Sequence, residues 1–99
     1  MIIYNTTFHA DHSHKEEFVQ FLKQTYIPRA IEGGLLKDAQ LAKVMGNEEE
    51  GVSYALQFKT ESLDTLDLWN GRVGKELTAM IAQKFQHKVA GFSTLLELL

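Results

Sequence analysis

The sequence predicts an α+β fold in which four strands and two helices follow one another in the order strand, helix, strand, strand, helix, strand. Two periodicities carry this prediction. Residues 2–10 and 52–59 alternate side chains with the period of two that is typical of strands, whereas residues 18–30 and 63–81 repeat apolar side chains at helical spacing. The 99 residues are 44% hydrophobic, which suits one domain, 1–99, built around one core.

The first strand and the first helix are expected in the first third of the chain. β-branched and aromatic residues alternate over residues 2–10, which favours a strand. Ser13 and Glu16 have the spacing of a capping box, in which each side chain bonds a free backbone N–H, so we expect the helix to begin there. Gly33 and Gly34 favour the left-handed backbone that ends a helix.

Both predicted helices contain residues that interrupt a regular α-helix. Pro28 lacks the backbone N–H that would bond four residues back, so we expect a kink near Tyr26 and Ile27. Gly71 and Gly74 are expected to weaken or break the second helix.

The rest of the chain is expected to add three strands and the second helix. An extended segment over 35–45 leads through a loop with a glycine at each end, 46–51, into a strand over 52–59. Ser62 is expected to cap the second helix, and residues 89–98 to form the last strand. This order is that of the ferredoxin-like fold, a four-stranded antiparallel sheet with both helices on one face.

The composition excludes several classes of partner and site. The formal net charge of −3 and the pI near 5.7 lack the basic excess that binding to nucleic acid requires. The absence of cysteine excludes disulfides, thiolate metal sites and a cysteine nucleophile, which suits a reducing compartment. The sequence shows neither a leader nor an apolar stretch of membrane-spanning length, so we expect a cytoplasmic protein without a membrane partner.

The two faces of the predicted sheet differ in character. The face under the helices is expected to carry large apolar side chains, namely Ile2, Tyr4, Phe8, Tyr54, Leu56, Phe58, Phe92 and Leu96. The opposite face is expected to carry small and mostly neutral residues, namely Ile3, Asn5, Thr7, His9, Ser53, Ala55, Gln57, Ser93 and Leu95. A solvated face is usually richer in Lys and Glu, so we expect a second copy of the chain to cover it in a homodimer.

Asn5 and Trp69 are candidate ligand-binding residues. Strands avoid Asn, so Asn5 either turns its amide into a cavity or bonds a neighbouring helix end. Trp69 shares the apolar stripe of the second helix, so it either anchors the core or forms a pocket wall.

Tyr26 and Arg29 complete the set of candidate ligand-binding residues. The phenol of Tyr26 either reaches the mouth of a pocket or packs its ring on the sheet. The guanidinium of Arg29 suits the capture of a carboxylate or a phosphate, or else forms surface ion pairs with Glu32 or Glu76.

Three histidines and an aspartate lie close together in the sequence. His9, Asp11, His12 and His14 are of residue types that bind metal ions. They fall on a strand end, a turn and a first helical turn, so their side chains are not expected to converge on one ion. We therefore expect an exposed turn and no metal site.

Three short segments resemble one protein family. Residues 1–5 (Met-Ile-Ile-Tyr-Asn), 26–28 (Tyr-Ile-Pro) and 92–97 (Phe-Ser-Thr-Leu-Leu-Glu) look like a bacterial family of small proteins that is known as a domain of unknown function. The element order also resembles the dimeric α+β barrel superfamily, which includes antibiotic-biosynthesis and haem-degrading monooxygenases. This resemblance implies a homodimer with a cavity between sheet and helices in each subunit, and it implies no particular activity.

The likeness to the haem-degrading members covers only part of their site. Those members use an Asn on the first strand, with a Trp and a haem-ligating His on the second helix. Asn5 and Trp69 occupy comparable places, but residues 77–81 contain no histidine and His87 comes too late in the chain. We therefore expect neither haem nor another cofactor.

Three functions are compatible with these features. The first is a non-catalytic homodimer that binds a small aromatic or carboxylated molecule. The second is a cofactor-independent oxygenase or isomerase, in which an electron-rich aromatic substrate itself reacts with oxygen. The third is a structural module that binds a protein partner. The sequence favours the first.

Overall fold

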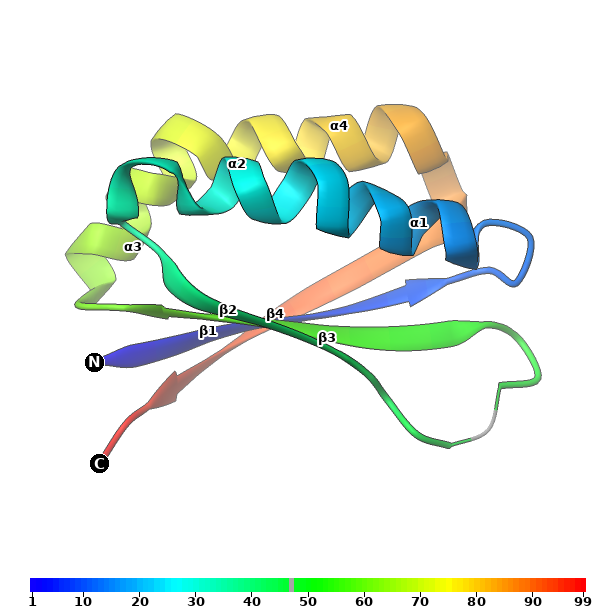
Figure 1. Cartoon of the computed structure of the whole chain (residues 1–99), viewed down its shortest axis with the longest axis horizontal. Helices are drawn as coiled ribbons and strands as arrows, with labels where there is room; N and C mark the ends of the chain where they lie inside the picture. The colour runs from blue at the N-terminus through cyan, green and yellow to red at the C-terminus, as the bar shows by residue number, and fades with distance from the viewer. Residues whose placement is uncertain (47) are drawn as a thin grey trace.

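Four antiparallel strands form one sheet in the spatial order β2-β3-β1-β4 (Figure 1). The computed structural model describes residues 1–46 and 48–99 of the chain. The strands are β1 (Ile2–Ala10), β2 (Lys37–Lys43), β3 (Val52–Thr60) and β4 (Val89–Glu97). β1 has its predicted bounds, whereas β2 is shorter than the predicted range of 35–45, because Leu35 still has helical backbone angles, φ −68° and ψ −35°, and the strand begins only at Lys37.

Two helical arms cover one face of the sheet (Figure 1). The first arm consists of α1 (Lys15–Phe21), the π turn η1 (Leu22–Tyr26), α2 (Ile27–Ile31) and the 3₁₀ turn η2 (Glu32–Gly34). The second consists of α3 (Leu63–Trp69), the π turn η3 (Asn70–Gly74), α4 (Lys75–Phe85) and the 3₁₀ turn η4 (Gln86–Lys88). Within residues 1–46 and 48–99, no helix has the length and apolar character to cross a membrane. The predicted ferredoxin-like fold is confirmed.

π turns interrupt both helical arms at the predicted breaks. In the first arm, the N–H of Ile27 bonds the carbonyl oxygen of Leu22, five residues back and immediately before Pro28. In the second arm, the N–H of Lys75 bonds the carbonyl oxygen of Asn70 in the same way. Each arm therefore changes helix type at mid-length instead of ending there.

One of the two predicted helix caps is present. The hydroxyl oxygen of Ser62 accepts a hydrogen bond of 3.1 Å from the N–H of Thr65. The predicted cap at Ser13 is wrong, because the helix begins two residues later, and Ser13 bonds Nδ1 of His14 at 2.8 Å instead. A turn causes this shift: the N–H of His14 donates to the carbonyl oxygen of Asp11 at 2.9 Å and keeps Ser13 outside the helix.

The faces of β4 are the reverse of the prediction. The pairing of β4 with β1 places Phe92 and Leu96 on the outer face of the sheet, away from the helices. Ser93 pairs with Thr6 on the helix side, and Leu95 lies on that side too. β4 has apolar residues on both of its faces, so its sequence pattern does not determine which face is buried.

Aromatic rings fill much of the space between helices and sheet. Phe8 of β1 meets Phe18 of α1 edge to face with ring centroids 5.2 Å apart, and Phe18 meets Phe85 of α4 in the same geometry at 5.2 Å. Trp69 packs its ring against the edge of Tyr4 at 5.7 Å near the other end of the core. These contacts connect both helical arms to β1.

Candidate functional site

A cavity of about 330 Å³ lies on the helix side of the sheet, between β1, β4 and α4. Its walls include Tyr4 and Thr6 of β1, Tyr26 of η1, Ile81 of α4, and Ser93 of β4. None of the described residues that line it is charged. A cavity of this size with mixed apolar and hydroxyl walls suits an uncharged small molecule.

Small residues on β4 leave this space open. A Cβ atom at Gly91 would lie 2.9 Å from Cδ1 of Phe8, so a side chain here would displace the Phe8 ring. Ser93 adds only a hydroxymethyl group two residues further along the same side of β4. Every residue of β4 after Val89 is exposed, so the cavity opens at this edge of the sheet.

Three hydroxyl groups form a chain along one wall of the cavity. Oγ of Ser93 donates to the hydroxyl of Tyr4 at 3.4 Å and lies 3.0 Å from Oγ1 of Thr6. A serine has one hydroxyl hydrogen, so Thr6 is the donor in the second bond. The hydroxyl hydrogen of Tyr4 is then free to bond an acceptor on a ligand.

The phenol of Tyr26 faces the same cavity from the first helical arm. Its hydroxyl makes no hydrogen bond within the described residues, although the side chain is buried. Burial raises the pKa of Tyr26 far above the usual phenol value, and the nearby phenol of Tyr4 raises it further. Tyr26 therefore stays protonated and is a hydrogen-bond donor at every physiological pH.

Gln86 lines the end of the cavity in an unusual backbone conformation. Its φ of 52° and ψ of −132° lie in a region that residues other than glycine rarely adopt. Such a conformation costs free energy, which the surrounding contacts must offset. It places an amide, both a donor and an acceptor, beside the uncharged walls.

The structure brings two of the four predicted ligand-binding residues to this region. Tyr26 lines the cavity. Trp69 lies behind the wall, where its ring contacts Tyr4 and its Nε1–H donates to the carbonyl oxygen of Ala30 at 2.9 Å. Trp69 is therefore a core anchor that supports Tyr4, and it is not itself one of the residues that line the cavity.

Asn5 lies on the opposite face of the sheet. It pairs with Gln57 of β3 and Thr94 of β4 in the same register that directs Tyr4 and Thr6 toward the helices. Its side-chain Oδ1 is buried and has no hydrogen-bond partner within the described chain. Asn5 therefore contributes nothing to the walls of this cavity.

Arg29 lies on the solvent side of the helical arms. Its guanidinium bonds Glu76 at 2.6 Å and Glu32 at 3.1 Å, which joins α2 to α4. The hydrogen bond with Glu76 is the largest of the effects that raise the pKa of Arg29. The surface ion pairs considered for Arg29 are thus both present.

The three histidines near the first turn have separate partners. Nδ1 of His9 lies 3.1 Å from Oγ of Ser53, Nε2 of His12 bonds the carbonyl oxygen of Glu48, and Nδ1 of His14 bonds the hydroxyl of the preceding residue. In the part of the chain that the structure describes, no three His, Asp or Glu side chains come together as metal ligands.

Five polar residues of the cavity were not among the candidates predicted from the sequence: Tyr4, Thr6, Thr78, Gln86 and Ser93. Tyr4 has the pattern of a core residue, and Ser93 was assigned to the wrong face of β4. The pairing of Thr6 with Ser93 is the signal that would have found the hydroxyl chain, because paired residues of adjacent strands share a face. No pattern in the sequence marks Gln86.

Solved structures with the same fold share little sequence with this chain. An EthD family protein from Bacillus halodurans has a TM-score of 0.68 at 15% identity, with 100% of both chains covered. A MhuD mutant, with two manganese protoporphyrin IX molecules bound per active site, has a TM-score of 0.71 at 14% identity, with 100% of this chain and 95% of that chain covered. A dimeric ferredoxin-like protein from an uncultured marine organism has a TM-score of 0.63 at 16% identity, with 100% and 99% covered. These likenesses show the fold alone.

The family of the chain follows from its sequence as a whole. No curated protein matches it. One family model matches residues 1–99, in agreement with the resemblance seen in the three short segments. The chain belongs to this family, the domain of unknown function DUF4286.

Proposed function

We propose that the chain functions as a homodimer in which each subunit binds a small, uncharged aromatic molecule between its sheet and its helices. The cavity beside β4 carries this proposal. It has a volume of about 330 Å³ and no charged residue among its described walls, and it contains two phenols, Tyr4 and Tyr26, whose hydrogens have no acceptor within the described chain.

The lining groups indicate which chemistry the ligand has. Two phenol donors on facing walls suit one carbonyl oxygen, which accepts two hydrogen bonds. Phe8 and Ile81 offer apolar contacts for a flat ring between these donors and the opening at β4. An aromatic ketone, lactone or quinone has this combination, whereas a carboxylate would lose its hydration without meeting a positive charge.

The outer face of the sheet supports the homodimer. Phe92 is 65% exposed and Leu96 is 44% exposed on this face, next to the neutral residues Thr7 and Asn5 of β1. A second copy would remove these apolar side chains from water and offer polar groups to the unpartnered Oδ1 of Asn5. The marine protein of the same fold is dimeric, which agrees with this assignment.

A cofactor-independent oxygenase is the second candidate, because an uncharged cavity would also hold an electron-rich aromatic substrate that itself reacts with oxygen. No carboxylate, imidazole or amine lines the described cavity to remove a proton from that substrate, so we favour binding. Oxygen uptake measured with 1-naphthol distinguishes the two functions. Binding of 1-naphthol without oxygen uptake supports the binding protein, and uptake that Tyr26→Phe abolishes supports the oxygenase.

A structural module that only binds a protein partner is disfavoured by the same cavity. Such a module needs no open space between its sheet and its helices, whereas this chain has a cavity of about 330 Å³ there.

A titration with coumarin, a neutral aromatic lactone, tests the ligand site. We expect amide NMR signals around Tyr26 and Ser93 to shift, and Tyr26→Phe to weaken coumarin binding about fivefold, the loss of one hydrogen bond of about 1 kcal/mol. Tyr54→Phe is the matched control, because Tyr54 lies outside this cavity. Shifts confined to other parts of the chain, or equal affinities for both variants, would contradict the proposal.

A further inference from the structure

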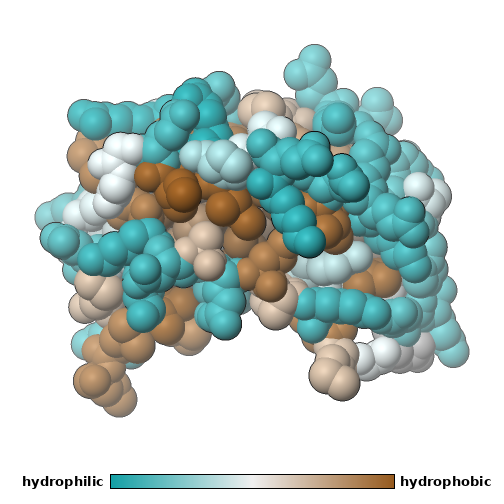
Figure 2. All heavy atoms as spheres, viewed as in Figure 1, coloured by the Kyte–Doolittle hydropathy of each residue, from teal (hydrophilic) through white to brown (hydrophobic). Residues whose placement is uncertain are grey.

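A second hollow lies between the first helical arm and the strands β2 and β3. It has a volume of about 470 Å³ and shares no lining residue with the cavity beside β4. Apolar surface is visible between the helices and the nearest strands, framed by hydrophilic side chains (Figure 2). We call this second hollow the lysine groove, because Lys15, Lys23 and Lys43 line its walls.

The two walls of the lysine groove place cations around an apolar centre. Lys15, Val19 and Lys23 follow one another at intervals of four residues on the first helical arm, so they share one face of it. On the opposite wall, Lys43 of β2 is the cross-strand partner of Tyr54 of β3, so these two side chains lie on the same side of the sheet. Val19, which lies between Lys15 and Lys23 on the helical wall, therefore faces the ammonium of Lys43 and the phenol of Tyr54 on the strand wall.

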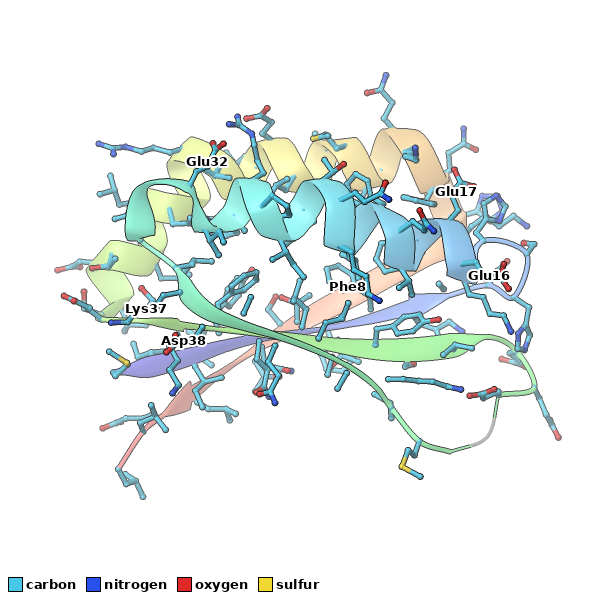
Figure 3. All side chains as sticks on the ribbon, in the orientation of Figure 1. Phe8, Glu16, Glu17, Glu32, Lys37 and Asp38 are labelled. Carbon is cyan, nitrogen blue, oxygen red and sulfur yellow. The ribbon has the colours of Figure 1, made fainter. Side chains whose placement is uncertain are left out.

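The lysine groove is positive in a chain whose net charge is −3. Among the described residues that line the groove, Glu16 is the one carboxylate. Glu16 points from α1 toward the sheet, whereas the next residue, Glu17, points away from the sheet and pairs with Lys84 of α4 at 3.8 Å (Figure 3). The carboxylates of this helix therefore neutralise only part of the charge of the groove.

The three lysines differ in how far they are already paired. Lys43 forms an ion pair with Glu48. Nζ of Lys15 lies 3.4 Å from the imidazole Nδ1 of His12, and its charge also helps to lower the pKa of Glu48. Lys23 makes no ion pair within residues 1–46 and 48–99. Lys23 is thus free to pair with an anion from solution.

Tyr54 supplies a neutral donor next to these cations. Its residue is 9% exposed and its ring packs against Phe18 with centroids 6.4 Å apart, yet its hydroxyl makes no hydrogen bond to a described residue. Burial raises the pKa of Tyr54, so the hydroxyl keeps its hydrogen at neutral pH. The hydroxyl is therefore oriented by its packed ring and has its hydrogen available.

We propose that the lysine groove binds a small organic anion, a carboxylate on an aromatic or aliphatic body. The carboxylate lies between Lys23 and the hydroxyl of Tyr54, and the apolar body lies against Val19 and Val52. An ion pair alone would be weak at such an exposed site, so the apolar contact is needed for selectivity over inorganic anions. The anion and the uncharged ligand of the other cavity occupy different sites in the same subunit.

Titrations with benzoate, benzamide and inorganic phosphate at matched ionic strength test this site. We expect benzoate to shift the amide NMR signals of residues 15–24 and 52–54, and benzamide and phosphate to leave them unchanged. Lys23→Gln is expected to weaken benzoate binding about threefold, the usual scale of one exposed ion pair. Lys75→Gln is the matched control, because it removes the same charge from a lysine outside the groove.

Each other outcome overturns the proposal. Equal shifts with benzamide would mean that charge is not recognised, and equal shifts with phosphate would mean general screening of the lysines. Equal loss of affinity in both lysine variants would mean an effect of net charge alone. Tyr54→Phe is expected to weaken benzoate but not coumarin, and Tyr26→Phe the reverse. Comparing these two variants with both ligands therefore shows whether the proposed anion site or the proposed cavity site is wrong.

Discussion

The indole N–H of Trp69 donates a hydrogen bond of 2.9 Å to the backbone carbonyl oxygen of Ala30, across 39 positions of sequence. This bond joins the end of α3 to α2, so it connects the two helical arms beside their π turns. The same indole ring packs against Tyr4 in the cavity wall. A single buried side chain, 1% exposed, thus holds the helical layer and one of the two phenols in place.

Trp69→Ala is expected to lower the free energy of unfolding by about 3 to 5 kcal/mol, because it leaves a large void and removes the bond to Ala30. Urea unfolding measures this loss. Leu68→Ala is the control, since Leu68 is an exposed neighbour on α3 and its loss should cost less than about 1 kcal/mol. Similar losses in the two variants would show that Trp69 is not the anchor.

Gly91→Ala is expected to destabilise the protein by about 1 to 3 kcal/mol, because the added Cβ would meet the ring of Phe8 at 2.9 Å. The methyl group also enters the cavity beside β4, so coumarin binding should weaken. Gly71→Ala serves as the control, because a Cβ there would meet no atom within 4 Å. Unfolding of Gly91→Ala at the same urea concentration as the wild type would contradict this close contact with Phe8.

The raised pKa of Tyr26 predicts a loss of stability in alkali. The phenol of the unfolded chain ionises near pH 10.0, while the folded phenol stays protonated, so the free energy of unfolding falls as the pH rises above 10.0. Below pH 10.0 this contribution is fully present. Tyr26→Phe has no such proton, so between pH 9 and pH 11 it should lose less stability than the wild type. Parallel losses would argue against a buried phenol at this position.

Asn5→Ala is expected to leave coumarin affinity unchanged within twofold, because Asn5 lies on the face of the sheet opposite the cavity. The sequence placed Asn5 among the ligand-binding residues, so this variant separates that expectation from the observed geometry. The NMR titration with coumarin that is used for Tyr26→Phe also measures the coumarin affinity of Asn5→Ala. A fivefold loss in Asn5→Ala would require a ligand site on the outer face, between the subunits of the proposed homodimer.

Local patterns of the sequence predicted much of the fold. Period-two alternation located β1 over its full length, and Pro28 and Gly74 marked the π turns, because each of these signals depends on the backbone of a few neighbouring residues. Ser62 was a correct cap for the same reason. The predicted cap at Ser13 failed, since the turn closed by His14 competes for the same residues.

The site was harder to predict, because it depends on pairing between distant residues. The cavity exists where Gly91 and Ser93 lie beside β1, and that placement requires the register of an edge strand with apolar residues on both faces. Tyr26 was found because it precedes a helix break. The positive φ of Gln86 has no sequence signature.

Phe92→Glu is expected to disrupt the proposed homodimer, because it places a charge at an exposed large side chain of the outer face. Phe92 is also among the residues that line the cavity beside β4, so coumarin affinity is expected to fall in this variant as well. Leu68→Glu is the control, since it places the same charge on an exposed residue of α3 on the helical side. A dimer that survives Phe92→Glu but dissociates in Leu68→Glu would place the interface on the helices instead.

Native mass spectrometry of the untagged protein at micromolar concentration tests the homodimer and its ligand together. We expect twice the chain mass of 11.2 kDa, and a mass increase of one coumarin molecule per subunit when coumarin is added. Phe92→Glu should give the single-chain mass. A single-chain mass for the wild-type protein would mean that the apolar outer face of the sheet has another cover, and would contradict the account.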